Sequence, residues 1–272
     1  MDQPLLFFDC VSMCYHDDSG ETEVLSDFTL RVDSGEFLAL LGPSGCGKST
    51  VLSLAAGLLK PDSGRVTLRG QEIRRPPLHM GYMLQRDHLF PWLTVRENAL
   101  LGIRVRQKEP SARQKRHVED LLAACGLTEF ADALPGQLSG GMLQRAAAAL
   151  LMALLSGGMR QRAALVRTLA VEPDFLLLDE PFSALDAQTR IQLSDEVKQQ
   201  LSGGAAATIL VTHDVSEAIS MADRVVVLTR RPARLRSEHR IDLPGSPMER
   251  RRSAQFKDYF DRIWKELDVH VQ

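Results

Sequence analysis

The stretch FLALLGPSGCGKST, residues 37–50, decides the fold. It opens on a continuous apolar run, Phe37 to Leu41, which is typical of a buried strand. The loop that follows, Gly42 to Ser49, fits the pattern GxxxxGK[ST] in full. From Lys48 to Leu59 apolar residues recur at helical spacing, until KPDSG at 60–64 ends the pattern. A strand, a glycine-rich loop and a helix in this order predict a loop that binds the phosphates of a nucleotide.

The residue types in this phosphate loop suit that chemistry. Glycines allow backbone N–H groups to turn inward onto phosphate oxygens, and the following helix directs its positive end at them. Lys48 is expected to reach the β and γ phosphates, and the Ser49 hydroxyl is expected to bind Mg²⁺. ATP and Mg²⁺ are therefore the expected cofactors. The expected nucleotide-binding residues are Gly42, Pro43, Ser44, Gly45, Cys46, Gly47, Lys48, Ser49 and Thr50.

Two carboxylates follow a second apolar run. Asp179 and Glu180 come directly after Phe175 to Leu178, so they are expected at the C-terminal end of a parallel strand. Ligands of open α/β sheets bind at that edge. Asp179 suits Mg²⁺ coordination, and Glu180 is the candidate general base for in-line attack of water on the γ-phosphate. Together with the phosphate loop, the pair predicts an ATPase.

The flanking segments predict an α/β core with additions. Between Leu5 and Phe37 apolar and polar residues alternate, which predicts an antiparallel β subdomain at the N-terminus. Apolar runs at 175–179, 208–212 and 224–228 indicate a parallel sheet. A helix at about 186–201 is expected between the first two of these strands.

Two further helical regions are expected outside this core. Residues of about 91–154 read as mostly helical and are predicted to form an inserted helical subdomain. After PGSP at 244–247, an amphipathic helix is expected to end near Leu267, so that about 244–272 forms a helical tail.

Composition restricts the partners. A formal net charge of −2 over 272 residues argues against nucleic acid as the main ligand. The N-terminus lacks the pattern of a secretory signal, and the longest apolar run, 146–155, is half the ~20 residues that span a bilayer. A local basic cluster is interpreted as a solvated face. It consists of Arg230, Arg231, Arg234, Arg236 and Arg240.

Five motifs together resemble the nucleotide-binding subunits of ABC transporters. GPSGCGKST, LSGGM followed by QR, LLLDEP, SALD and VTHD occur in this order, and the resemblance covers essentially the whole chain. LSGG is the most specific of them, because few other phosphate-loop ATPases have it. The resemblance implies a RecA-like P-loop NTPase core, with residues 1–272 forming one ABC nucleotide-binding domain.

The resemblance also implies roles for single residues. Gln85 resembles the Q-loop glutamine, which senses Mg²⁺ and the attacking water. His213, in VTHD, resembles the switch histidine that contacts the γ-phosphate. Tyr15 resembles the aromatic residue that stacks on adenine, although a core aromatic explains it equally well. Residues 183–186, SALD, resemble the D-loop, which crosses to the opposite subunit.

Partners and location follow from the same resemblance. In this family the signature loop of one subunit faces the γ-phosphate held by another, so a homodimer is expected. Integral-membrane permease subunits, and through them a solute-binding protein, are the further expected partners. The expected location is the cytoplasmic face of the membrane, held peripherally. LFPWLTVREN at 89–98 resembles the subfamily that serves importers of nitrate, sulfonate and taurine.

Other functions remain as alternatives. An ABC-type ATPase acting on nucleic acid or ribosomes is disfavoured by the net charge and by the lack of a second ATPase domain or a coiled-coil insertion. A GTP-dependent switch is disfavoured because no NKxD or TKxD motif is present.

The chain departs from the family in carrying the signature twice. LSGGMLQR at 138–145 is repeated as LSGGMRQR at 155–162, an offset of 17 residues. A continuous helix would be rotated by about 260° over such an insert, so one copy should be looped out or form an extra helix. We expect residues 138–154 to be that extra segment.

The residues favour the second copy as the working one. Ser156 lies 23 residues before Asp179, the separation typical of the family, whereas Ser139 lies 40 before it. The second copy has Arg160 and Arg167 where the first has leucines. The first copy keeps the preceding sequence PGQ that is usual for the family, so both stay open. Ser156, Gly157 and Gly158 are the expected signature contacts to nucleotide. A sluggish ATPase, impaired by the duplication, is the alternative outcome.

Overall fold

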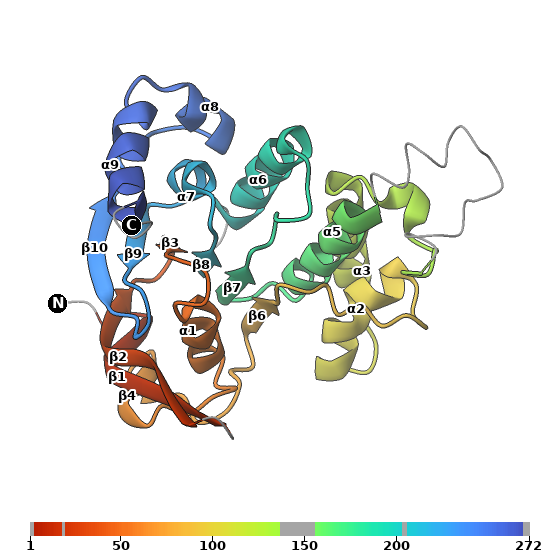
Figure 1. The fold of residues 1–272 in the computed structure, drawn as a ribbon. Coiled ribbons are helices and arrows are strands. Elements are labelled where there is room, and N and C mark those ends of the chain that lie inside the picture. Colours follow the sequence, from red (N-terminus) through yellow and green to blue (C-terminus); the bar gives the residue numbers. More distant parts are fainter. Residues whose placement is uncertain (1–2, 18–19, 137–155, 203–205, 269–272) are drawn as a thin grey trace. The chain divides into compact units, whose positions relative to one another are not determined.

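The computed structural model describes residues 3–17, 20–136, 156–202 and 206–268. It consists of two compact units (Figure 1), described here one at a time. The first comprises residues 1–80, 174–180 and 197–272, and the second comprises 81–173 and 181–196. Within the described ranges, none of the helices combines the length and apolar character that crossing a bilayer requires.

An antiparallel sheet opens the first unit. Its strands are β1 (Leu6–Asp17), β2 (Gly20–Val32), β4 (Ser63–Leu68) and β5 (Gln71–Glu72), in the order β2-β1-β4-β5. All pairings are antiparallel, which confirms the predicted N-terminal β subdomain. The strands β1 and β2 are longer than the short hairpins expected, and β4 and β5, which follow the phosphate-loop helix, were not predicted.

A parallel sheet forms the core of the same unit. Its strands are β3 (Phe37–Leu41), β7 (Phe175–Asp179), β8 (Ala207–Val211), β9 (Arg224–Leu228) and β10 (Leu235–Arg240), in the order β10-β9-β3-β8-β7. Every residue of β3, β7 and β8 is buried, which explains their continuous apolar sequences. The pairs among β9, β3, β8 and β7 are parallel, and β10 adds an antiparallel edge. Strand β6 (Met80–Met83) spans the boundary between the units.

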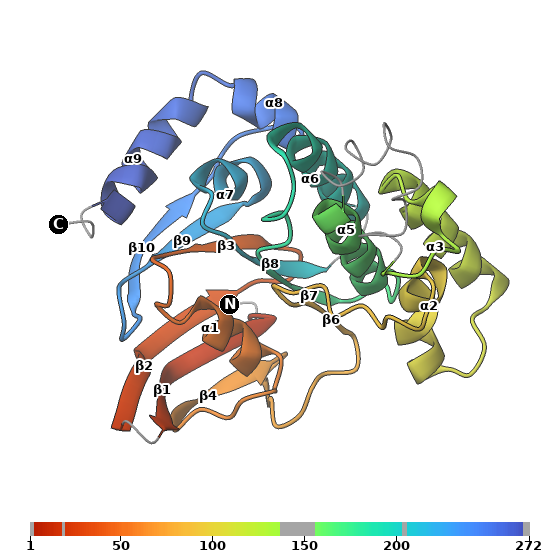
Figure 2. The ribbon, with the colours of Figure 1, turned by 45° about the vertical axis from the view of Figure 1, so that its right-hand side comes forward.

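Helices cover both faces of this sheet. Helix α1 (Lys48–Ala55) lies between the two sheets of the first unit, and α7 (Val215–Met221) lies on the other face of the parallel sheet (Figure 2). The helix α1 ends before the predicted Leu59, because Gly57 turns the chain at φ 66°. The single C-terminal helix expected is two helices, α8 (Pro247–Arg252) and α9 (Phe256–Asp268).

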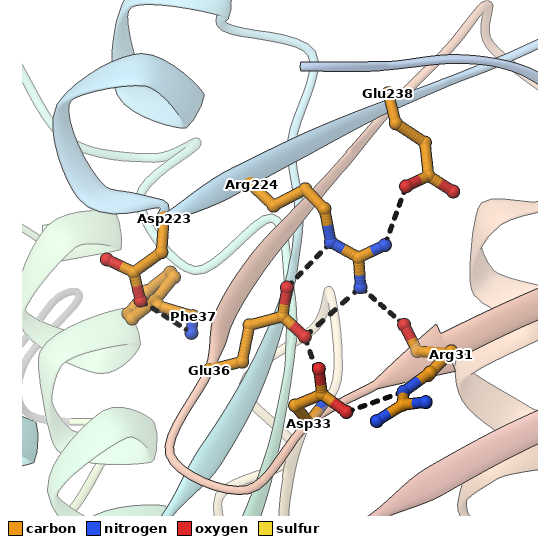
Figure 3. A network of polar contacts seen from close by, with 7 residues as sticks. All are labelled: Arg31, Asp33, Glu36, Phe37, Asp223, Arg224 and Glu238. Atoms are coloured by element: carbon orange, nitrogen blue, oxygen red, sulfur yellow. Dashed lines mark hydrogen bonds and ion pairs between the residues drawn. The ribbon is translucent and has the colours of Figure 1, made fainter. Parts of the chain in front are cut away.

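A network of charges anchors β3, the strand that leads to the phosphate loop (Figure 3). The Arg224 guanidinium donates to the Glu36 carboxylate at 2.6 and 3.1 Å, to Glu238 at 2.8 Å and to the Arg31 carbonyl. Asp223 accepts from the Phe37 amide at 2.9 Å. The turn before β3 is thereby fixed to the start of β9.

The second unit is helical. It contains α2 (Val95–Arg106), α3 (Ala112–Ala124), the short 3₁₀ helix η1 (Thr128–Phe130), α5 (Ser156–Leu169) and the first part of α6 (Ala187–Ser202). Helices α2 and α3 each begin at a capping box, Thr94 with Glu97 and Ser111 with Gln114. The described part of the predicted helical stretch at about 91–154 lies in this unit. The predicted extra segment, 138–154, and the first signature copy lie outside the described residues.

Candidate nucleotide-binding site

The phosphate loop joins β3 to α1, as its sequence predicts. Gly45 and Gly47 adopt φ values of 72° and 123°, which favour glycine. A Cβ atom on Gly47 would lie 2.9 Å from Val24 Cγ1, so this position has no room for a side chain. The Lys48 ammonium group is buried and donates to the carbonyls of Gly42 and Pro43 at 2.7 and 2.9 Å. Its charge therefore lies within the curve of the loop.

Strand register brings the candidate residues of the first unit to one edge. Strand β8 lies between β3 and β7, and its Val211 is in register with Leu40 on one side and Asp179 on the other. The chain continues from β3 into the phosphate loop, from β7 into Glu180 and from β8 to His213. Sequence-distant residues thus converge at the carboxyl edge of the sheet, where ligands of such sheets bind.

Asp179 lies against the first turn of α1. Its carboxylate accepts a hydrogen bond from the side chain of Ser49, and the residue is buried. Burial raises the pKa of Asp179, as does the neighbouring charge of Glu180, while the Ser49 hydrogen bond and Lys48 act in the opposite direction. A hydroxyl and a carboxylate are the oxygen ligands that Mg²⁺ takes alongside substrate phosphates, so the pair fits this ion.

Glu180 faces His213. The Glu180 Oε1 and His213 Nδ1 atoms are 3.3 Å apart, and the glutamate is the more enclosed of the two. The backbone of Glu180 has a φ of 50°, which is uncommon for a residue other than glycine. The Glu180 amide donates to the Val211 carbonyl at 2.9 Å. Strained backbone of this sort clusters at functional sites. His213 stands just before Asp214, which caps α7.

Tyr15 also borders the phosphate-loop helix. Its hydroxyl lies 3.3 Å from the Thr50 hydroxyl, and the residue is 41% exposed. A core aromatic would be covered, whereas Tyr15 is partly open to solvent beside α1. The position is compatible with base stacking.

The remaining predicted site residues belong to the second unit. Gln85 is exposed and follows β6 by two residues. Ser156, Gly157 and Gly158 form the first turn of α5, so the second signature copy starts a helix. A serine and backbone amides at a helix N-terminus can hold a phosphate group.

Gln161 ties this helix to the SALD segment. Its amide donates to the Ser183 hydroxyl at 3.3 Å, and its side-chain oxygen accepts from the Ala184 amide at 3.0 Å. A Cβ atom on Gly158 would lie 2.7 Å from Leu185 Cδ2, so the two segments are in close contact. The second signature copy and the D-loop-like segment therefore form one packed structure.

Two arginines of the second copy fix the chain just after Gln85. Arg160 donates to the Asp87 carboxylate, and Arg167 donates to the backbone carbonyls of Asp87 and His88 at 2.7 Å each. Burial of Asp87 acts to raise its pKa, but the hydrogen bonds from Arg160 and the Leu89 amide, together with the charges of Arg160 and His88, outweigh it and the net pKa is lowered. The sequence singled out both arginines, but their partners were not predicted.

A phosphate loop between a parallel strand and a helix, with carboxylates at the end of another strand of the same sheet, defines the class of P-loop nucleotide-binding proteins. The ABC transporter family matches residues 25–154 and again 150–183. The chain belongs to this family, whose members are ATPases. The first matched segment includes the first signature copy, and the second includes the other copy. The predicted family and its P-loop fold are confirmed.

Individual relatives cover most of the chain. The chain is 39% identical over 251 residues to the aliphatic sulfonates import ATP-binding protein SsuB of Bacillus licheniformis, covering 92% of this chain and 89% of that protein. It is 41% identical over 216 residues to the nitrate import ATP-binding protein NrtC of Synechocystis sp., covering 79% of this chain and 30% of that protein.

A solved structure agrees in fold. The dimeric post-hydrolysis state of the ATP-binding cassette MJ0796, bound to ADP and Pi, has a TM-score of 0.73 and 26% sequence identity. The match covers 87% of this chain and 98% of that chain. The architecture predicted from the motifs is thus that of a known ABC cassette.

Proposed function

We propose that this chain is the ATP-hydrolysing subunit of an importer for small anionic solutes of the sulfonate or nitrate type. The observation that carries the proposal is the convergence at one sheet edge of the phosphate loop, the Ser49–Asp179 hydrogen bond and the Glu180–His213 pair. The names of its relatives, which import aliphatic sulfonates and nitrate, support the class of solute.

The phosphate loop and Lys48 bind the triphosphate of ATP. The buried ammonium group supplies positive charge where the β and γ phosphates would lie, and backbone amides of the loop add to it. Tyr15 stacks on the adenine. Bound Mg²⁺ would be held by Ser49 and Asp179, and it would neutralise charge on the phosphates.

Glu180 acts as the general base for hydrolysis. Its carboxylate stands at the strand end next to Asp179, and it takes the proton of the attacking water. His213, 3.3 Å away, orients this carboxylate and contacts the γ-phosphate. The unusual φ of Glu180 sets the direction of its side chain.

A second copy of the chain completes the site. The N-terminal turn of α5, with Ser156, Gly157 and Gly158, meets the γ-phosphate held by the other subunit's phosphate loop. ATP binding then drives closure of the dimer, and hydrolysis reopens it. The dimeric state of MJ0796 supports this arrangement.

Permease subunits receive the motion through the second unit. Near Gln85 this unit exposes two aromatic side chains, Phe90 at 38% and Trp92 at 69%, with ring centroids 5.2 Å apart. Exposed aromatic pairs suit protein interfaces. The subunit would thus sit peripherally on the cytoplasmic face of the membrane and act on a solute-binding protein only indirectly.

ATP turnover of the purified transporter tests the function. Solute-dependent ATPase activity in the complex of this chain with its permease, measured against sulfonates and nitrate, supports the proposal. A complex that binds ATP but turns it over equally slowly with every solute would favour the alternative, an ATPase impaired by its duplicated signature.

A further inference from the structure

Arg231, which is distant in sequence from the phosphate loop, is hydrogen-bonded to it. It lies between β9 and β10, and its guanidinium donates to the Gly45 carbonyl through Nε at 3.1 Å and through a terminal nitrogen at 2.7 Å. The two residues are 186 positions apart in sequence. The Gly45 carbonyl of the loop therefore accepts two hydrogen bonds from one cationic side chain.

The segment that carries Arg231 is itself fixed in place. The Ala233 amide donates to the Val24 carbonyl at 2.8 Å, and the Ser26 amide donates to the Ala233 carbonyl at 3.3 Å. Arg234 donates to the Ser26 hydroxyl at 3.0 Å. This part of β2 also closes off the Gly47 side of the phosphate loop, through Val24. The segment that carries Arg231 is thus hydrogen-bonded to β2, the strand that also borders the phosphate loop.

These contacts change the interpretation of the basic cluster. A solvated face was the expected role of these arginines, which are Arg230, Arg231, Arg234, Arg236 and Arg240. Arg231 and Arg234 are exposed, yet each makes a specific hydrogen bond within the first unit. The bidentate geometry at Gly45 uses the planar fork that distinguishes arginine from lysine.

A donor on the Gly45 carbonyl acts on the loop amides. That carbonyl belongs to the same planar peptide unit as the Cys46 N–H, which donates to the Pro43 carbonyl across the loop at 3.2 Å, so Arg231 holds one side of the peptide and Pro43 the other. A guanidinium at the oxygen also polarises the peptide and strengthens its N–H as a donor. Burial raises the pKa of the Cys46 thiol, while the charges of Lys48 and Arg231 act to lower it. The charge of Arg231 therefore acts on Cys46, a residue of the phosphate loop.

We propose that Arg231 is a positioning residue for nucleotide binding, which fixes the Gly45–Cys46 peptide of the phosphate loop and adds positive charge beside the loop. The inference rests on the proposed function, since the loop must bind a nucleotide. Arg231 acts through Gly45 and touches neither the nucleotide nor the attacking water.

The test compares four full-length proteins: the wild type, Arg231→Ala, Arg231→Lys and Arg240→Ala. Arg240 is exposed on β10 and serves as the matched loss of one positive charge. Fluorescent ADP titration gives Kd, steady-state assays give KM and kcat for ATP, and thermal unfolding without nucleotide gives Tm. Arg231→Ala is expected to raise Kd and KM roughly fivefold, with kcat and Tm unchanged, as loss of one exposed charge-assisted contact would.

The other proteins separate the possible causes. Arg231→Lys should recover part of the affinity through a single donor, and Arg240→Ala should bind like the wild type. The defect of Arg231→Ala should shrink at high salt, because screening weakens the wild-type advantage. Wild-type affinity in Arg231→Ala overturns the proposal. The proposal is also overturned if Arg231→Ala has a lowered Tm, a lowered kcat and a raised Kd, and Arg231→Lys recovers none of them. That pattern would mean that Arg231 only stabilises the fold.

Failure of the proposed function looks different. In that case the wild type itself binds no nucleotide, and the inference about Arg231 falls with it.

Discussion

Arg160 and Asp87 form a bidentate ion pair, with the guanidinium Nε and a terminal nitrogen 2.8 and 3.0 Å from the two carboxylate oxygens. Both side chains are largely enclosed, at 31% and 23% exposure. Position 160 is one of the places where the two signature copies differ, since the first copy has Leu143 there. The pair thus links the sequence of the second copy to the segment after Gln85.

Arg160→Leu, which restores the residue of the first copy, should destabilise the second unit by about 2 kcal/mol, because a partly buried carboxylate loses its charged donor. Trp92 belongs to this unit and Trp264 to the first, and the chain has only these two tryptophans. Urea unfolding followed by Trp92 fluorescence, in a Trp264→Phe background, measures the change.

The control is a double-mutant cycle with Asp87→Asn. If the pair is what stabilises the unit, adding Asp87→Asn to Arg160→Leu should cost little more than either change alone. Fully additive losses would show that the two side chains contribute separately.

The signature copies should differ in function. Ser156→Arg places a bulky charge in the first turn of α5 and is expected to abolish ATP hydrolysis, whereas Ser139→Arg should leave it near wild type. Steady-state ATPase assays on both variants, with ATP binding measured alongside, separate lost closure from lost binding. Active Ser156→Arg and inactive Ser139→Arg would reverse the assignment.

Glu180→Gln should trap the nucleotide. The amide keeps the size of the side chain but cannot accept a proton, so turnover should fall by about two orders of magnitude or more while ATP stays bound. Retention of radiolabelled ATP after gel filtration and steady-state turnover are the two measurements. Near-normal turnover would remove Glu180 from its role as the base.

The central strands were predictable because burial on both faces leaves a continuous apolar run. Strands β7 and β9 match the predicted ranges 175–179 and 224–228 residue for residue. The edge strand β10 was not predicted, since LRSEHR carries charges along a half-exposed edge and lacks such a run. Burial pattern, and not strand propensity alone, decided which strands could be recognised.

In the candidate site, too, some features could be predicted from the sequence and others could not. Lys48, Ser49, Asp179 and Glu180 stand in motifs whose spacing to strand ends already implies their position, and the structure brings the four to one sheet edge. The contact between Arg231 and Gly45 has no such signal. It depends on how β2 and the β9–β10 segment pack, which no local pattern reports.

The C-terminal helix should be sensitive to acid. Glu266 on α9 accepts hydrogen bonds from Ser237 and His239, and the Arg236 charge acts on it too. Burial acts to raise the pKa of Glu266, but these groups outweigh it and lower the pKa below its ordinary 4.5. A carboxylate with a lowered folded pKa stabilises the fold above its unfolded pKa, and this contribution is lost as the pH falls through the folded value.

Wild type and Glu266→Gln should therefore differ in stability at pH 6 and converge below about pH 4.5. Trp264 fluorescence in a Trp92→Phe background reports on α9 during urea unfolding. Asp261→Asn, an exposed carboxylate change on the same helix, is the matched control and should follow the wild type. A constant difference between wild type and Glu266→Gln at every pH would contradict the assignment.

In a chain with two near-identical segments, either segment could in principle form the helix that packs at one position of the fold. The charged donors of Arg160 and Arg167 give the second candidate an energy gap over the first, which has leucines at both places. A gap of about 3 kcal/mol already corresponds to more than a hundredfold preference in population. Two charged side chains are thus enough to break the degeneracy that the repeat would otherwise create.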